Sequence, residues 1–309
     1  MRKNKKAAEI ELRETAQDLR LDEENTNKPI KMPIIRRGNE TKLLDIEWCW
    51  KPFIPFAKVS EVVGSGGDGK TTMILTVAAL LSQGIAPPSL ERGHLLASHP
   101  CEPISVFYLT NEDEVADSSL KRFKRAGGDD KRFFYSGELE EHMTLTEENL
   151  MYVMKETGCR LMIIDPIQAF LPEGVHMSNS AKMRPLTTML SNVAKKTDVA
   201  IVLVGHLNKS ESSKLINQVG GSADLAASVR SILLVEMSKR DRETRWVKAI
   251  KSNFDESDYT PIKLVMDNER KLSFAELKDS SACSEKSGEP CKTGAFRMFN
   301  ADYVSTEDG

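Results

Sequence analysis

The sequence predicts an α/β fold in which a mainly parallel, twisted sheet is covered by helices on both faces. Three observations support this fold class. Short apolar segments alternate with segments of helical periodicity from about residue 58 to residue 205. These apolar segments are continuous rather than alternating, which is typical of strands buried on both faces. Finally, a glycine-rich loop joins one strand to the helix that follows it.

The glycine-rich loop is the most informative stretch of the chain. It reads Gly-x-x-x-x-Gly-Lys-Thr from Gly64 to Thr71, which is the phosphate-binding loop pattern. The β-branched run from Lys58 to Val63 before it predicts a buried strand, and the run from Thr71 to Leu81 predicts an apolar helix. A chance glycine-rich turn is the alternative, and the correct flanking elements argue against it.

This loop predicts binding of a nucleoside triphosphate. Glycines allow backbone N–H groups to turn inward around an anion, and the helix N-terminus adds partial positive charge. Lys70 can reach the β- and γ-phosphates, and the Thr71 hydroxyl can ligate Mg²⁺. We therefore expect ATP and Mg²⁺ as cofactors. The expected cofactor-binding residues are Gly64, Ser65, Gly66, Gly67, Asp68, Gly69, Lys70, Thr71 and Thr72.

Composition limits the other possibilities. The 309 residues include 43 Lys and Arg against 46 Asp and Glu, so contact with nucleic acid requires a local basic patch. No apolar run has the length of a membrane span, and the basic start is followed by charged residues where a signal peptide would be apolar. Five cysteines without C-x-x-C spacing argue against a disulfide framework or a zinc site. We expect a soluble, cytoplasmic protein without membrane contact.

The composition changes along the chain predict three parts. Residues 1–40 are dominated by charged residues and predict a partly disordered arm, with a charged helix from Ala7 to Leu21 as the alternative. Residues 41–278 form the expected ATPase domain, and residues 279–309 a disordered tail. The aromatic stretch from Glu47 to Phe56 predicts core in preference to a contact with adenine.

Further strands and helices are expected along the domain. We expect strands at 104–110, 132–135, 160–165 and 199–205, and helices that end near 125, span 145–157 with Thr144 or Thr146 as cap, and span 183–196. The last predicted strands are 231–236, 245–252 and 261–266. Because no helix is expected between these three, we predict antiparallel additions at one edge of the sheet.

Acidic residues follow two of the apolar strands, at the sheet end where such folds bind ligands. Asp165 fits the acid that holds Mg²⁺ in P-loop enzymes. The next residue is Pro166, although many such ATPases have a glutamate there. Glu112 is therefore the candidate base that orients the attacking water, and Asp113 and Glu114 are its competitors. A solvated acidic helix start is the structural alternative.

A third strand ends at Gly205, followed by two candidate donors. His206 or Asn208 could donate to the γ-phosphate, although a lone histidine is more often structural. The segment from Lys209 to Ser222 is long and mostly polar, as functional or disordered loops are.

With these elements in order, residues 42 to 275 resemble the RecA-type ATPases, in particular the branch with RepA-like plasmid replication helicases and related bacterial and mobile-element ATPases. The resemblance extends beyond the phosphate loop. It rests on Trp48-x-Trp50-x-Pro52-x-Ile54-Pro55, Tyr108-Leu109-x-x-Glu112-Asp113, Ile163-Ile164-Asp165-Pro166-Ile167-Gln168, Gly205-His206-x-Asn208-Lys209 and Gly221-Ser222-Ala223-Asp224 to Arg230.

The resemblance implies a RecA-like core that assembles into a homo-oligomeric ring, usually a hexamer, with ATP between subunits. It implies Glu112 as catalytic glutamate and His206 as sensor of the γ-phosphate. Loops after Phe170 and Asn208 would face a channel for single-stranded DNA. A cation from the next subunit would complete the site, and the candidates are Arg230, Lys248 and Lys251.

One feature of the resemblance is weak, because a DNA channel needs stacking aromatics beside its basic residues. The two loops offer Lys182, Arg184, His176, Lys209 and Lys214, with Phe170 at the margin. We therefore expect an ATP hydrolase, and beyond that a DNA helicase or DNA-stimulated motor in replication or recombination. The alternatives are an ATP-dependent regulatory switch and a DNA-binding loading factor without unwinding activity.

Overall fold

The computed structural model describes residues 37–41, 43, 45–111, 115, 118–136, 143–177, 179–207, 223–255 and 257–275. The chain divides into two units, Met1–Asp45 and Ile46–Gly309. In the first unit the described residues include a 3-10 helix, η1 (Gly38–Glu40), whose residues are exposed. Most of the predicted N-terminal arm and the whole predicted tail at 279–309 lie outside the described residues.

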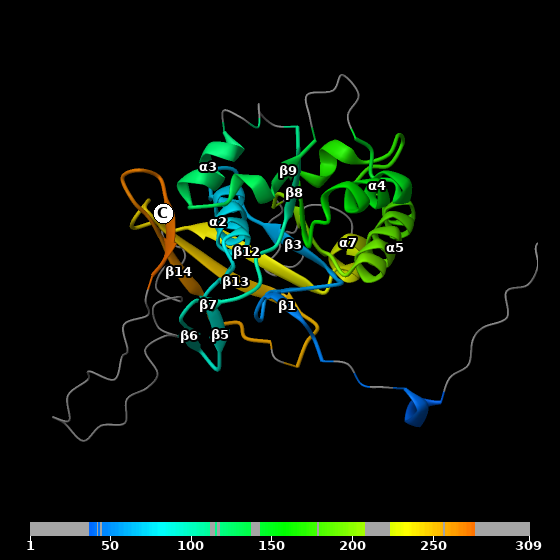
Figure 1. Ribbon diagram of the computed structural model, residues 1–309, viewed down its shortest axis with the longest axis horizontal. Coiled ribbons are helices and arrows are strands. Elements are labelled where there is room, and N and C mark those ends of the chain that lie inside the picture. The colour runs from blue at the N-terminus through cyan, green and yellow to red at the C-terminus, as the bar shows by residue number, and fades with distance from the viewer. Residues whose placement is uncertain are drawn as a thin grey trace, which may run out of the picture. The chain divides into compact units, whose positions relative to one another are not determined.

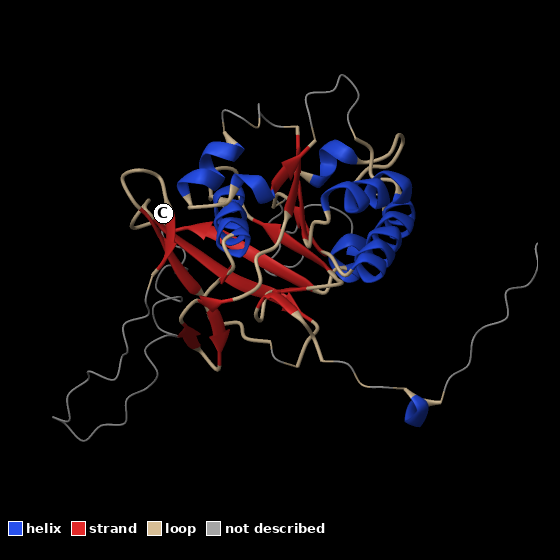
Figure 2. Cartoon of the chain, viewed as in Figure 1, coloured by secondary structure: helices blue, strands red, loops and turns tan. Residues whose placement is uncertain are grey.

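The second unit contains a nine-stranded sheet with the order β15-β14-β13-β12-β3-β11-β10-β8-β9 (Figures 1 and 2). Its strands are β3 (Val59–Val63), β8 (Val106–Thr110), β9 (Phe133–Tyr135), β10 (Leu161–Asp165), β11 (Ala200–Val204), β12 (Ser231–Met237), β13 (Thr244–Ser252), β14 (Ile262–Met266) and β15 (Leu272–Phe274). The helices are α2 (Lys70–Ser82), α3 (Ser119–Arg125), α4 (Glu147–Thr157), α5 (Ser180–Thr197) and α7 (Ala223–Ser228), with 3-10 helices η2 (Asp130–Arg132) and η3 (Ile167–Phe170).

The predicted α/β fold with a mainly parallel sheet is confirmed. Strands β9, β8, β10, β11, β3 and β12 pair in parallel. Strands β13, β14 and β15 add to them antiparallel. One expectation was wrong, because the strand that begins at Ser231 is parallel to β3 instead of antiparallel. The short helix α7, which the sequence pattern did not reveal, precedes this strand and covers the sheet as a crossover helix would.

Two hydrophobic cores cover the two faces of the sheet. Alternate residues of each strand point to opposite faces, so β10 supplies Ile163 to one core and Ile164 to the other. The first core contains α2 and α3, and the second contains α4, α5 and α7 (Figure 1). Burial on both faces explains why the strands read as continuous apolar runs.

Local sequence explains where two of the helices begin. Thr146 is the N-cap of α4, where its side chain accepts a hydrogen bond from the Asn149 amide at 3.2 Å, so one of the two predicted caps is confirmed. The Asn179 side chain caps α5 through the Lys182 amide, also at 3.2 Å. Pro185 is the sixth residue of α5, so it cannot donate the backbone hydrogen bond that a helix normally makes to the carbonyl oxygen of Ala181.

Small hairpins lie outside the main sheet. Strands β1 (Trp48–Trp50) and β2 (Ile54–Pro55) pair with each other, β4 (Ile85–Ala86) pairs with β7 (His99–Pro100), and β5 (Ser89–Glu91) pairs with β6 (His94–Leu96). The aromatic stretch around β1 is core, as predicted, because Trp50, Phe53 and Ile54 are buried. Within the part of the chain that the structure describes, no helix combines the length and apolar character needed to cross a membrane.

Candidate nucleotide-binding site

The phosphate-binding loop connects β3 to α2, as its sequence predicts. Gly67 has φ +84° and Gly69 has φ +92°, both in the left-handed region that favours glycine. The Asp68 carboxylate accepts a hydrogen bond from the Ser65 amide at 2.8 Å, which closes the turn of the loop. A Cβ added at Gly66 or Gly67 would meet no atom within 4 Å, so the open side of the loop has room for an anion.

The loop requires glycine at position 64 because a side chain there would collide with a neighbouring strand. A Cβ at this position would lie 2.3 Å from the carbonyl oxygen of Val235 in β12. No backbone atom can tolerate such a contact without moving, so the first glycine of the loop lets the chain pass closely over the neighbouring strand.

Lys70 begins α2 and its side chain is buried. Its Nζ donates hydrogen bonds to the carbonyl oxygens of Gly64 and Ser65, both at 2.9 Å. The ammonium therefore lies within the loop, where it could contact a bound phosphate. This position agrees with the phosphate-binding role that the motif predicts.

The two predicted metal ligands lie together. Thr71 at the start of α2 donates its hydroxyl hydrogen bond to Oδ2 of Asp165, at the end of β10, at 2.6 Å. Two oxygen donors at this separation suit Mg²⁺, which prefers hydroxyl and carboxylate oxygens. The residues present thus fit the metal that the sequence predicts.

Tyr108 is a site residue that the sequence reasoning did not assign a role. Its hydroxyl donates to the same Oδ2 of Asp165 at 3.1 Å, and Ser119 donates to the Tyr108 hydroxyl at 3.4 Å. Burial raises the pKa of Tyr108, and the Asp165 charge raises it further. The phenol therefore stays protonated as a hydrogen-bond donor to the carboxylate.

Several influences act in opposite directions on the pKa of the Asp165 carboxyl. Burial raises the pKa of its carboxyl, whereas hydrogen bonds from Thr71 and Tyr108 and the charges of Lys70 and His206 lower it. A bound cation would favour the ionised form in the same way. His206 directly follows β11 and is exposed, and its charge is the smallest of the influences that lower the pKa of Asp165.

The predicted base Glu112, with its competitors Asp113 and Glu114, lies outside the described residues. Strand β8 ends at Thr110, which pairs directly with Asp165. The end of β8, two residues before Glu112 in the sequence, therefore lies beside the candidate metal site. Asn208 and the polar segment to residue 222 are also outside the description.

The structure does not bring Arg230 and Lys251 to the phosphate loop of the same chain. The Arg230 amide donates to the carbonyl oxygen of Val59, at the start of β3, whereas the loop follows its end. The Lys251 Nζ donates to the carbonyl oxygens of Ala226, Ala227 and Val229 at 2.6 to 2.9 Å.

The third candidate cation, Lys248, forms an ion pair with Glu236 at 3.2 Å. A role for any of the three candidate cations in the site of a neighbouring subunit stays a prediction.

A buried acid lies in the strand that leads to the loop. The Glu61 side chain is fully buried in β3, and neither carboxylate oxygen has a hydrogen-bond partner among the described residues. Burial raises the pKa of Glu61 to about 8, although the Lys251 charge opposes this. A Cβ at Gly205 would lie 2.9 Å from Glu61 Oε1, so this acid packs against the chain just before His206.

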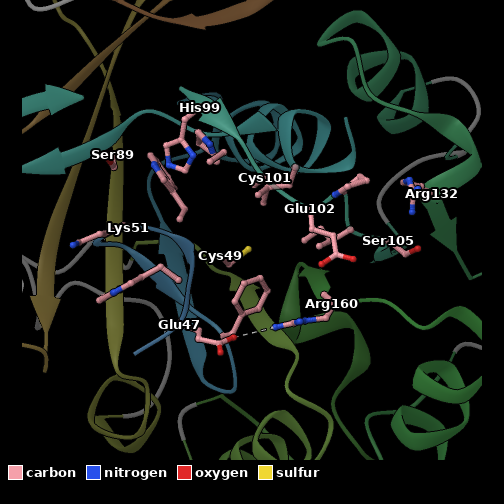
Figure 3. A pocket seen from close by; sticks show the side chains of 18 of the residues that line it. Glu47, Cys49, Lys51, Ser89, His99, Cys101, Glu102, Ser105, Arg132 and Arg160 are labelled. Carbon is pink, nitrogen blue, oxygen red and sulfur yellow. Dashed lines mark ion pairs between the residues drawn. The ribbon is translucent and has the colours of Figure 1, made fainter. Parts of the chain in front are cut away.

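A separate cavity of about 540 Å³ lies where β8 and β10 begin (Figure 3). The phosphate loop follows the end of β3, which runs in the same direction in the sheet, so the cavity lies at the opposite end of the sheet. Arg160 lines it, paired with Asp198 at 2.8 Å and Glu47 at 3.7 Å, and its guanidinium lies 4.2 Å from the ring centroid of Phe56. Cys49 and Cys101, which also line the cavity, are free thiols, as is Cys159. None of the predicted site residues contributes to this cavity.

Comparison with known proteins shows the family and supports the fold. A family model described as an AAA domain matches residues 32–212. The DNA repair protein RadA of Listeria monocytogenes is 24% identical over 195 residues, which are 62% of this chain and 36% of the relative. RadA of Streptococcus pneumoniae is 27% identical over 194 residues, 62% of this chain and 38% of the relative. The match thus spans little more than a third of these relatives.

Among solved structures, a crystal structure of the RadB recombinase superposes with a TM-score of 0.50 at 14% identity. The superposition covers 72% of this chain and 93% of that one. At this identity the similarity supports the fold alone. The chain belongs to the AAA domain family and has the RecA-like fold of P-loop ATPases.

Proposed function

We propose that this protein is a Mg²⁺-dependent ATPase that acts on DNA in repair or recombination. The observation that carries the nucleotide part is the contact of 2.6 Å between Thr71 and Asp165, which joins the phosphate loop to an acid on another strand. The DNA part is supported by the RadA relatives, whose names describe DNA repair proteins.

In the proposed reaction, each group of the chain has a distinct task. The loop amides and Lys70 bind the phosphates, and Thr71 and Asp165 hold Mg²⁺, which would neutralise phosphate charge when bound. Glu112 orients the attacking water and accepts its proton, while His206 donates to the γ-phosphate. A cation from a neighbouring subunit in a ring, Arg230, Lys248 or Lys251, completes the site.

Calorimetry with ATP and Mg²⁺ tests binding, and phosphate release tests hydrolysis. We expect Lys70→Ala to abolish hydrolysis with most ATP affinity lost, whereas Lys195→Ala, on an exposed helix surface, should behave as wild type. Glu112→Gln should bind ATP without turnover. If wild type takes up no nucleotide, the proposal is wrong; normal turnover by Glu112→Gln would instead move the base to Asp113 or another residue.

Stimulation of hydrolysis by single-stranded DNA separates a DNA-dependent enzyme from a regulatory switch. A strand-displacement assay then distinguishes a helicase, such as those of the RepA-like branch, from a loading factor. Native mass spectrometry with ATP and single-stranded DNA tests the hexameric ring, and a monomer under both conditions would argue against a site shared between subunits.

A further inference from the structure

Arg245 is a buried cation packed against the phosphate loop. It is the second residue of β13, and its residue surface is 6% exposed. A Cβ built on Gly69 would lie 3.1 Å from Arg245 Nε and 3.6 Å from its Cδ. The guanidinium stem thus lies directly against the last glycine before Lys70.

The described hydrogen bonds of Arg245 do not pair its positive charge with a negatively charged acceptor. Nη1 donates to the carbonyl oxygens of Arg242 and Thr244, both neutral acceptors. Nε is buried and has no acceptor among the described residues. A guanidinium in this position is unfavourable unless negative charge lies nearby, because burial removes its hydration. Burial accordingly lowers the pKa of Arg245, whereas the charges of Asp68 and Asp241 raise it.

The sheet order separates Arg245 from the candidate metal ligand Asp165. Asp165 ends β10, on one side of β3, whereas Arg245 lies in β13 on the other side. Under the proposed function, the Mg²⁺ ligands Thr71 and Asp165 mark the side of the site for the γ-phosphate. Arg245 lies on the other side of β3 from Asp165.

We infer that Arg245 is a positioning residue for the nucleotide: it fixes the Asp68–Gly69 part of the phosphate loop, and its buried charge strengthens the binding of the phosphates. This inference rests on the proposed function. Nε is enclosed by protein, so Arg245 acts through the loop and through its electric field, which a low-dielectric environment screens weakly. Because Arg245 and the candidate metal ligand Asp165 lie on opposite sides of β3, Arg245 should strengthen ATP and ADP binding alike and leave the chemical step unchanged.

Two variants test the role of the charge. Arg245→Gln removes the charge together with the Nη1 donor, because the glutamine side chain ends where Nε of arginine lies, and Arg245→Lys retains the charge. We expect Arg245→Gln to weaken ATP and ADP binding by similar factors of about 10, with a raised KM and unchanged kcat. Arg245→Lys should recover most of the affinity. Arg242→Gln, an exposed cation three residues earlier, is the matched control and should bind as wild type.

Calorimetry with ATP and with ADP, steady-state kinetics and thermal unfolding without nucleotide give the necessary readouts. Wild-type affinity in Arg245→Gln would overturn the inference, as would an equal loss of affinity in Arg245→Lys. A Gln variant that does not fold, beside a Lys variant that does, would show that the charge supports the fold instead of the ligand. Failure of wild type to bind any nucleotide would overturn the proposed function itself, a result distinct from all of these.

Discussion

Replacing Glu61 by glutamine tests how a buried acid affects the stability of the sheet. The Glu61 side chain is fully buried, both its oxygens lack partners among the described residues, and its pKa is raised from 4.5 to about 8. Desolvation is the main cause, and Lys251 is the nearby cation that opposes it. Glutamine has nearly the same shape as glutamate but does not titrate. The substitution therefore measures how protonation of Glu61 contributes to the free energy of unfolding.

The raised pKa fixes the sign of the effect. Between pH 4.5 and pH 8 the unfolded chain releases the proton while the folded chain keeps it, so wild-type stability falls as pH rises. Each pH unit within this interval corresponds to about 1.4 kcal/mol. From pH 5 to pH 7, wild type should therefore lose roughly 3 kcal/mol relative to Glu61→Gln, and the difference should become constant above the folded pKa.

Urea unfolding followed by circular dichroism at pH 5, 6, 7 and 8 measures this difference. Glu156→Gln, an exposed position on α4, is the matched control and should show no such pH dependence. A constant difference between wild type and Glu61→Gln from pH 5 to pH 8 would refute the reasoning, because it would mean that Glu61 is ionised in the folded protein throughout.

Three further changes test other contacts. Gly64→Ala should lose most nucleotide binding in calorimetry, because its Cβ would meet a β12 carbonyl oxygen at 2.3 Å; retained affinity would mean that the loop can shift freely. Tyr108→Phe removes a hydrogen bond to Asp165 and should raise the Mg²⁺ concentration for half-maximal ATP binding by up to about tenfold, whereas Tyr152→Phe, at an exposed position, should not. Thr146→Ala removes the cap of α4 and should lower the free energy of unfolding by about 1 kcal/mol, and an unchanged urea midpoint would contradict this.

The central fold could be predicted because its signals are local and strong. The phosphate loop fixes one strand and one helix, and continuous apolar runs identify the other central strands. Asp165 followed from the rule that ligands of such sheets lie at the carboxyl ends of strands. Asp165 accepts a hydrogen bond from Thr71, and its role as a metal ligand stays a prediction.

What escaped prediction depends on short elements or on register. Strands of two or three residues, such as β4 to β7, are too short for periodicity to appear, and α7 has only six residues. Tyr108 reads as an ordinary core residue of β8, and only its pairing with Ile163 brings its hydroxyl to Asp165. Glu61 carried a visible signal, an acid within an apolar strand, which the sequence reasoning did not use.

The position of Lys251 has a consequence for assembly. Its ammonium caps the end of α7 by donating to three carbonyl oxygens. If Lys251 served a neighbouring active site, it would have to leave these acceptors, and the end of α7 would lose its cap in the same step. Joining of subunits and fraying of that helix would then be thermodynamically linked, so amide hydrogen exchange in α7 should speed up when a ring forms through this residue and stay constant when it forms through another.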